Sequence, residues 1–294
     1  KPLGFGQITG IDILGESRGV LPSTEWKRNT YKKPEQQRWY SGETISLGIG
    51  QGYNNFTMLQ IAHAMGTVAN NGLKMKPHLV REVLDVETKA STPVAKEPIG
   101  QLSLLPENLE VIKRGMVGVN IEGTSATSFV GAQYVSAGKT GTAQVYTVKQ
   151  NEKYNAATID ERMRDHALFV AFAPADDPKV ALAMVVENAG FGAQNAAPIA
   201  RRVFDFVIMG QYPSQEDIEA VQKGQATRPI GKPRAVANVP WPPKAAELAV
   251  EEPIVAASAA ERAASAAEKA ASAAAKPASA SALVVQKAAA SAAR

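Results

Sequence analysis

The hexapeptide Lys139-Thr140-Gly141-Thr142-Ala143-Gln144 is typical of a β-strand, and β-forming residues continue from it to Tyr146. Thr140 and Thr142 are two positions apart, so a strand directs both hydroxyls to the same face. Gly141 lies in the opposite phase and lets other backbone approach closely, because it has no side chain. Together with the cation of Lys139, such a strand can bind a carboxylate, and its edge can pair with an extended peptide.

The Lys-Thr-Gly triplet is one of three signatures of enzymes in which β-lactams or D-alanyl peptides acylate an active-site serine. The others are Ser-x-x-Lys, which carries the nucleophile, and a Ser-x-Asn or Ser-Asp-Asn element. This chain has no Ser-x-Asn or Ser-x-Asp, and its one Ser-x-x-Lys runs from Ser136 to Lys139. Three positions on a strand place these two side chains on opposite faces, so Lys139 cannot activate Ser136. The sequence therefore predicts one wall of a site without its nucleophile.

A nucleotide-binding loop is the sharper alternative, because Gly138-Lys139-Thr140 matches the end of Gly-x-x-x-x-Gly-Lys-Thr. That motif needs a glycine where this chain has Gln133, and it needs a helix after the lysine. The following residues are β-forming, so a phosphate loop is not expected. An ordinary exposed strand that ends in a tight turn stays open on these residues alone.

Composition excludes several kinds of site in this chain of 294 residues. The net charge of +4 comes without a dense Lys/Arg run, so we expect no nucleic-acid partner. There is no cysteine for a disulfide or thiolate site, and His63, His78 and His166 lack metal-ligand spacing. We therefore expect no metal and no cofactor. The chain begins at Lys1 and has no 18-residue apolar run, from which we expect a fragment or processed form of a longer protein.

Two helices are predicted in the first half of the chain. Thr57 and Gln60 form a capping box for the first, and Asn71-Gly72 provides a left-handed stop. The second begins at Pro106, a favourable first-turn residue. Residues 81–100 between them are expected to form a surface hairpin. The apolar faces expected to be buried are Met58, Ile61, Ala62, Met65 and Val68 in the first helix, and Leu109, Ile112, Met116 and Val119 in the second.

In the second half of the chain, the sequence pattern becomes that of β-strands. A strand is predicted over 134–146 and a loop over 147–164. Two apolar runs follow at 166–173 and 180–188, and the short separator Pro174-Ala175-Asp176-Asp177-Pro178 between them predicts antiparallel neighbours. Residues 190–194 are expected to be a flexible turn. A closing helix is predicted over 196–209, and its expected buried side is Ile199, Val203, Phe206 and Val207.

The C-terminal part has a different composition. We expect a domain over residues 1–212 and a low-complexity Pro/Ala/Ser-rich tail over residues 213–294. An inexact seven-residue repeat starts at Ala256. Alanine favours helix but offers little apolar surface for a core, so the tail is expected to be disordered or partly helical. A weak coiled-coil or partner-binding role stays open. The serines of the repeat are Ser258, Ser265, Ser272 and Ser279.

Several separate motifs occur in the order found in one known family. The region from Gly4 to Met209 resembles the C-terminal half of the transpeptidase domain of class B penicillin-binding proteins, and within that class the elongation-specific penicillin-binding protein 2 group. The tail lies outside the resemblance. The matching stretches are Gly4-Phe5-Gly6, Thr9 to Asp12, Trp39 to Thr44, Gly48 to Tyr53, Thr57 to Gly72, Lys139 to Gln144, Arg164-Asp165-His166, Ala171 to Pro174 and Glu187-Asn188.

The resemblance implies an α+β fold with an antiparallel sheet flanked by helices, of the β-lactamase/transpeptidase type, which is incomplete in this chain. The Lys139 strand would form one edge, followed by the strands that begin at His166 and Val180. The remaining strands would come from an N-terminal half. The Val180 strand would then present an unpaired edge, which is an aggregation risk.

The resemblance also implies a serine acyl-transfer enzyme that cross-links peptidoglycan stem peptides and is inhibited by β-lactams. Lys139, Thr140, Gly141, Thr142 and Gln144 would bind substrate, and the Thr142 N–H would supply half of the oxyanion hole. The parent protein would lie at the periplasmic face of the bacterial inner membrane, anchored by an N-terminal helix that this sequence lacks. Its expected partners are stem peptides, β-lactams and membrane proteins of cell elongation. Without the nucleophile, the chain is expected to be inactive alone.

Two other functional classes stay open: a non-catalytic module that binds D-Ala-D-Ala peptides, and an interaction scaffold that recruits a partner through the tail. A general-acid role stays open for Asp12 and Glu16, but they are expected to be capping or solvated loop residues. Glu187-Asn188 is expected to be structural. The aromatic residues before the first helix either border a groove or pack against each other. They are Trp26, Trp39, Tyr40 and Tyr53.

Overall fold

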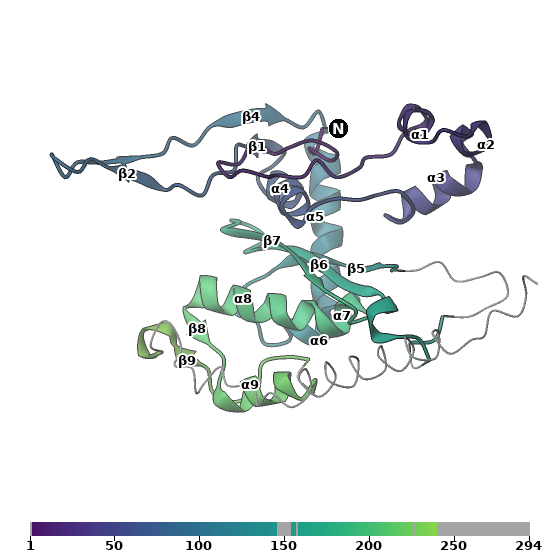
Figure 1. The fold of residues 1–294 in the computed structure, drawn as a ribbon. Coiled ribbons are helices and arrows are strands. Elements are labelled where there is room, and N and C mark those ends of the chain that lie inside the picture. The colour runs from purple at the N-terminus through teal and green to yellow at the C-terminus, as the bar shows by residue number, and fades with distance from the viewer. Residues whose placement is uncertain (1, 146–153, 157, 226, 240–294) are drawn as a thin grey trace, which may run out of the picture. The chain divides into compact units, whose positions relative to one another are not determined.

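Three strands form the central antiparallel sheet: β5 (Ala137–Ala143), β6 (His166–Ala173) and β7 (Val180–Val186). Their order is β5-β6-β7, with Thr140 opposite Phe169 and Phe169 opposite Met184. The computed structural model describes residues 2–145, 154–156, 158–225 and 227–239 (Figure 1). The predicted strand order and the α+β class are confirmed.

Helices cover both faces of this sheet (Figure 1). Neighbouring residues of β6 point to opposite faces. Phe169 and Ala171 pack with Phe204 of α8 (Ala197–Met209), whereas Phe172 packs with Ala69 of α4 (Met58–Ala69). Each face of β6 is thus closed by a different helix, and the strand order places β6 in the middle and β5 at a border.

The ends of α4 form as the sequence predicts. The Gln60 amide donates to Thr57 Oγ1 at 3.1 Å, and the Thr57 amide donates to Gln60 Oε1 at 3.0 Å. At the other end, Asn71 and Gly72 adopt φ values of 52° and 85°. Of the predicted apolar face, Met65 packs against the core. The fully buried residues of this helix include two polar ones, Gln60 and Thr67, whose side chains are hydrogen-bonded.

The buried faces of the two later helices differ from the prediction. In α5 (Pro106–Ile121) Leu109 is buried and Met116 packs against the core, but Ile112 is 45% exposed. In α8 three of the four predicted residues are exposed, namely Ile199, Phe206 and Val207. Small alanines bring α8 close to the sheet, and a buried ion pair lies on the same side, so hydrophobicity alone selects the wrong face. The buried residues of α8 are Ala197, Pro198, Ala200, Arg201, Phe204 and Asp205.

The predicted hairpin at 81–100 is confirmed as β2 (Glu82–Leu84) paired with β3 (Ser91–Pro93). Next to it, β1 (Leu73–Met75) pairs with β4 (Pro98–Gln101). The predicted flexible turn at 190–194 is wrong, because a short helix starts there. The remaining helices up to that point are α1 (Thr24–Thr30), α2 (Pro34–Gln37), α3 (Ser41–Gly48), α6 (Ala126–Phe129), the 3-10 turn η1 (Glu161–Met163) and α7 (Gly192–Asn195).

The compact unit continues past α8 and ends at Val239. It includes β8 (Gln211–Tyr212), α9 (Gln215–Gln222), β9 (Arg234–Ala235) and the 3-10 turn η2 (Val236–Asn238). The domain boundary predicted between residues 212 and 213 thus falls inside this unit. The Ala/Ser repeat and residues 147–153 and 157 of the predicted 147–164 loop lie outside the described residues. Within the described part, no helix has the length and apolarity to cross a membrane.

Candidate functional site

The Lys-Thr-Gly strand lies at a border of the sheet and continues as β-structure past Gly141 to Ala143. Lys139 is exposed, and its Nζ donates to the carbonyl of Thr140 at 2.8 Å. None of the ion pairs between described residues includes Lys139, so its charge is available to a ligand. Because Lys139 and the threonines differ in strand phase, a ligand that contacts all three must lie at the border of β5 rather than over one face.

A small buried network fixes the start of β5. Asn120 Nδ2 donates to Ser136 Oγ at 2.9 Å, and Ser125 Oγ donates to Asn120 Oδ1 at 2.6 Å. A Cβ on Gly138 would lie 3.1 Å from both polar atoms of the Asn120 amide, so this strand residue must be small. Ser136 is 4% exposed, which agrees with its exclusion as a nucleophile. The sequence analysis did not identify this network.

Two further contacts hold β5 at Thr140 and Gly141. Thr140 Oγ1 lies 3.1 Å from the hydroxyl of Thr124, which precedes α6. Gly192, at the start of α7, approaches the sheet closely. A Cβ at this position would lie 2.7 Å from the carbonyl oxygen of Gly141 and 2.1 Å from that of Leu168. The glycine-rich stretch at 190–194 therefore marks a close approach of backbone.

Gln51 contacts the outer edge of β5 from the turn that follows α3. Its Nε2 donates to the Thr142 carbonyl at 2.5 Å, and its Oε1 accepts from the Gln144 amide at 3.4 Å. In a strand the N–H and C=O of one residue point to the same side. The Thr142 N–H therefore faces the same border as its carbonyl. The glycines flanking Gln51, with φ values of 79° at Gly50 and 70° at Gly52, were the signal in the sequence for this turn.

Asp12 and Glu16 hold loops, as predicted. Asp12 accepts from the amides of Val80 and Leu79 at 2.9 and 2.7 Å, and these bonds lower the pKa of its carboxyl. Burial acts to raise the pKa of Glu16, but hydrogen bonds from Thr9 and Gly10 outweigh it, so that pKa is also lowered. Both carboxylates are charged acceptors of backbone N–H groups, which is a structural role.

The early aromatic residues pack around a buried cation. Lys27 is 3% exposed and pairs with Glu43, and its Nζ lies 6.0, 5.2 and 5.5 Å from the ring centres of Trp39, Tyr40 and Tyr53. Trp26 packs against Tyr53 at 5.2 Å. This arrangement favours the packing alternative over an aromatic-lined groove.

The histidines have structural partners. His63 and His78 bond to the carbonyls of Met75 and Val80, and His166 Nδ1 accepts from the amide of Asn188. The Asn188 side chain donates to two carbonyls in the 162–164 turn, which agrees with its predicted structural role. No cluster of His, Asp and Glu suited to a metal ion occurs in the described parts of the chain.

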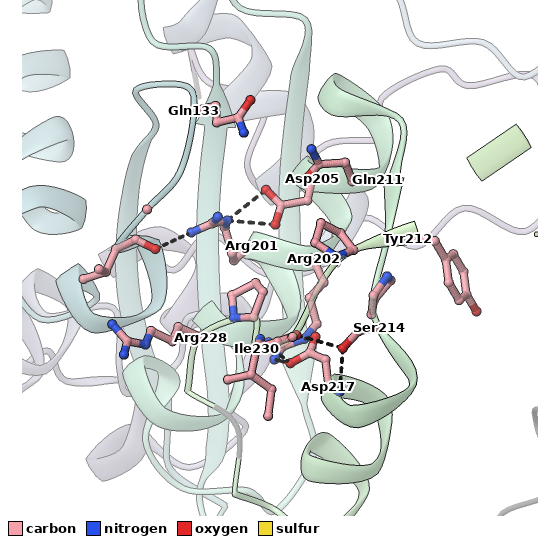
Figure 2. A pocket seen from close by; sticks show the side chains of 16 residues that line it. Gln133, Arg201, Arg202, Asp205, Gln211, Tyr212, Ser214, Asp217, Arg228 and Ile230 are labelled. Carbon is pink, nitrogen blue, oxygen red and sulfur yellow. Dashed lines mark hydrogen bonds and ion pairs between the residues drawn. The ribbon is translucent and has the colours of Figure 1, made fainter. Parts of the chain in front are cut away.

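A cavity of about 500 Å³ lies away from β5, between α8 and the segment from β8 to residue 233 (Figure 2). Its lining includes the charged residue Arg228 and two ion pairs. Arg201 Nε bonds both carboxylate oxygens of Asp205 at 2.8 and 2.9 Å, and Arg202 bonds those of Asp217 at 2.8 and 2.7 Å. No residue of β5 lines this cavity, so the two sites are separate.

Comparison with known proteins identifies the relatives of this chain. Residues 1–205 match the model of the penicillin-binding protein transpeptidase domain. The chain is 42% identical over 225 residues to the peptidoglycan D,D-transpeptidase MrdA of Haemophilus influenzae, which is 74% of this chain and 33% of that protein. It is 40% identical to MrdA of Escherichia coli K12, over 70% of this chain and 32% of that protein. The chain thus spans about a third of the length of the curated relatives it matches.

Solved structures agree with these matches. Penicillin-binding protein 2 of Pseudomonas aeruginosa, in complex with the compound WCK 5153, has 38% identity and a TM-score of 0.55, over 69% of this chain and 41% of that one. The Helicobacter pylori protein, in complex with MreC, has 28% identity and a TM-score of 0.55, over 71% and 35% of the two chains.

Proposed function

This chain belongs to the penicillin-binding protein transpeptidase family, and from that premise we propose that it forms the carboxylate-binding wall of a peptidoglycan D,D-transpeptidase. One observation carries the proposal. The Lys-Thr-Gly-Thr strand lies at a border of the sheet, and its exposed lysine is in no ion pair with another described residue. An unneutralised cation beside two hydroxyls at a strand edge suits the C-terminal carboxylate of an extended D-alanyl peptide.

Each residue of the strand has a proposed role. Lys139, Thr140 and Thr142 bind the terminal carboxylate of the stem peptide, or the carboxylate of a β-lactam in its place. Gly141 keeps the wall flat, and Gln144 lies at the far end of the bound peptide. The Thr142 N–H stabilises the tetrahedral oxyanion, a contact worth about 3–4 kcal/mol of transition-state stabilisation.

Acylation needs a nucleophile that this chain does not provide. Its one Ser-x-x-Lys ends at Lys139, and Ser136 is buried and hydrogen-bonded. Removal of the nucleophile from such a catalytic unit removes most of its catalytic power. We expect no covalent adduct when the isolated chain is incubated with fluorescent penicillin and analysed by denaturing gel. A labelled band would contradict this proposal.

Peptide binding tests the wall itself. We expect fluorescein-labelled N-acetyl-L-lysyl-D-alanyl-D-alanine to bind the chain in a fluorescence anisotropy titration. Lys139→Ala should weaken binding about tenfold to a hundredfold, because it removes a charge-assisted hydrogen bond of about 1.5–3 kcal/mol. The matched control is Lys96→Ala, which changes another exposed lysine without an ion pair to a described residue and should leave the dissociation constant unchanged. Equal binding by the chain and Lys139→Ala would refute the proposed wall.

The absence of a second Ser-x-x-Lys favours one rival function, a D-Ala-D-Ala binding module without chemistry. A chimaera distinguishes the two. In the chimaera, residues 1–239 of this chain replace the matching part of Haemophilus influenzae MrdA. The rest of the chimaera is the MrdA sequence. Acylation of the chimaera by fluorescent penicillin supports the transpeptidase. Peptide binding without acylation supports the binding module.

Partners and location are proposed from the relatives. A Helicobacter pylori relative was solved in complex with MreC, and we propose a comparable membrane partner of cell elongation at the periplasmic face of the inner membrane. Deletion of residues 240–294 from the full chain tests the scaffold alternative and leaves the compact unit whole. Loss of that partner, with binding of the labelled tripeptide intact, would assign partner recruitment to the tail.

A further inference from the structure

Gln51 occupies the strand edge that a bound peptide would use. Its carboxamide donates to the carbonyl of Thr142 and accepts from the amide of Gln144, two positions further along the chain and just past the end of β5. A backbone residue of an added parallel strand makes this same pair of bonds, one as donor and one as acceptor. The Gln51 side chain therefore imitates one residue of a neighbouring strand.

The contact can open without unfolding of the turn that carries it. The backbone of Gln51 is held separately, since its amide donates to the Ser46 carbonyl at 2.9 Å and its carbonyl accepts from Asn54 Nδ2 at 3.1 Å. The same Asn54 nitrogen also donates to the carbonyl of Leu47 at 3.2 Å. Rotation of the Gln51 side chain alone is enough to release Thr142 and Gln144. Substitution of that side chain leaves the backbone bonds of the turn in place.

We infer that Gln51 is a displaceable gate that determines which ligands pair with β5. This inference rests on the proposed function, because it concerns the same strand edge. A D-alanyl peptide has an amide N–H that can replace the Gln51 donor at the Thr142 carbonyl, so it can open the gate and recover the lost bond. A carboxylate ligand without such a donor has to leave that carbonyl unpaired or bind beside the closed gate, and it is selected against.

The cost of opening reduces the apparent affinity for the peptide, because only the open fraction of the molecules can bind. Removal of the gate should therefore tighten peptide binding. Opening breaks one short and one long hydrogen bond, at a net cost of about 1–1.4 kcal/mol. A variant without this cost should have a dissociation constant about five- to tenfold lower. A carboxylate ligand that binds beside the closed gate, such as acetate, should gain nothing from the same change, because it does not need the gate to open.

The experiment uses the full chain, the fluorescein-labelled tripeptide and fluorescence anisotropy. Gln51→Ala removes the gate, and Gln51→Met removes both hydrogen bonds while it keeps a side chain of similar length. Gln36→Ala is the matched control, because Gln36 is exposed on α2 and no side-chain hydrogen bond is seen for it within the described structure. Circular dichroism checks that each variant is folded. We expect both Gln51 variants to bind five- to tenfold more tightly than the unchanged chain and Gln36→Ala to match it.

The outcomes separate this inference from the proposed function. Unchanged or weaker binding by both Gln51 variants, with Lys139→Ala still disrupting binding, would overturn the gate and leave the carboxylate-binding wall intact. Binding that appears only when Gln51 is replaced would support the gate more strongly. Binding by no variant, or binding insensitive to Lys139→Ala, would overturn both. If Gln51→Ala does not fold, Gln51→Met alone tests the gate, because it preserves the side-chain volume.

Discussion

At the scale of single residues, β5 depends on a glycine whose missing side chain makes room for backbone. Gly192 begins α7 and lies next to Gly141 of β5. The position of a Cβ at Gly192 is occupied by the carbonyl oxygens of Leu168 and Gly141, at 2.1 and 2.7 Å. Because both obstacles are backbone atoms in the middle of a sheet, they cannot move aside as a flexible side chain would.

Gly192→Ala is therefore expected to push α7 away from the sheet and to displace β5. We expect a loss of about 1–3 kcal/mol in the free energy of unfolding, as for other overpacked sites. Gly115→Ala is the matched control, because Gly115 lies within α5 and no atom beyond the neighbouring backbone of its own helix stands within 4 Å of an added Cβ. That control should gain about 0.5–1 kcal/mol from helix propensity. Urea unfolding measures both, and equal stabilities would contradict the close approach.

At the scale of elements, ion pairs join segments that hydrophobic contacts alone would leave weakly attached. Arg202 of α8 makes a two-pronged pair with Asp217 of α9, whose carboxylate is fully buried and also accepts from the Ile230 amide at 3.1 Å. Ser214 caps α9 and accepts from the Asp217 amide at 3.0 Å. These contacts explain why the compact unit continues past the predicted boundary to Val239.

Arg202→Ala should leave the buried Asp217 carboxylate without its charged partner. Such a loss costs about 3–5 kcal/mol of stability, and urea unfolding measures it. A double variant with Arg202→Met and Asp217→Leu removes both charges and should recover most of the loss, because no buried charge is left unpaired. If the single variant is as stable as the unchanged chain, the pair does not attach α9.

The ion pair between Lys27 of α1 and Glu43 of α3 makes the stability of the fold depend on pH, with a sign that can be predicted. The hydrogen bond from Lys27, against an opposing effect of burial, lowers the pKa of the Glu43 carboxyl below its ordinary value of 4.5. A lowered folded-state pKa contributes stability that is fully present above the unfolded value and is lost as the pH falls through the folded value. Glu43→Gln should therefore be less stable than the unchanged chain at pH 7, and the difference should narrow below about pH 4.5.

Denaturant unfolding of both proteins from pH 7 to pH 3 measures this difference. The comparison isolates Glu43, because carboxylates such as Asp12 and Asp85 have lowered pKa values in both proteins. A difference that widens as the pH falls would show that the Glu43 carboxylate is not stabilised by its charge.

At the scale of the whole molecule, the sheet has two borders with different surroundings. The border at β5 carries the Lys-Thr-Gly-Thr row, and Gln51 covers part of it. At the other border, β7 pairs with β6 on one side, and the described residues provide no strand on its other side. Every residue of β7 is partly exposed. An unpaired strand of apolar residues is a template for pairing with another chain.

We therefore predict that the isolated chain self-associates as its concentration rises. Sedimentation velocity from about 1 to 50 μM should show a growing share of oligomers, because each molecule offers a β7 border to the next. The chimaera with Haemophilus influenzae MrdA is the control, since it keeps the part of that relative beyond the matched region. A monomeric, cooperatively unfolding chain over this range would contradict the prediction.

The sequence by itself determined the three strands of the central sheet, the capping of α4 and the family of the chain. These features come from local periodicity and short motifs, which neighbouring residues encode without reference to the rest of the fold, whereas the border position of β5 followed from the resemblance to that family. Tertiary structure alone decided that Gln51 contacts Thr142, 91 residues away, and that Gly192 abuts Gly141. It also decided the buried face of α8, because small alanines and an internal ion pair, rather than the most apolar stripe, fit the sheet.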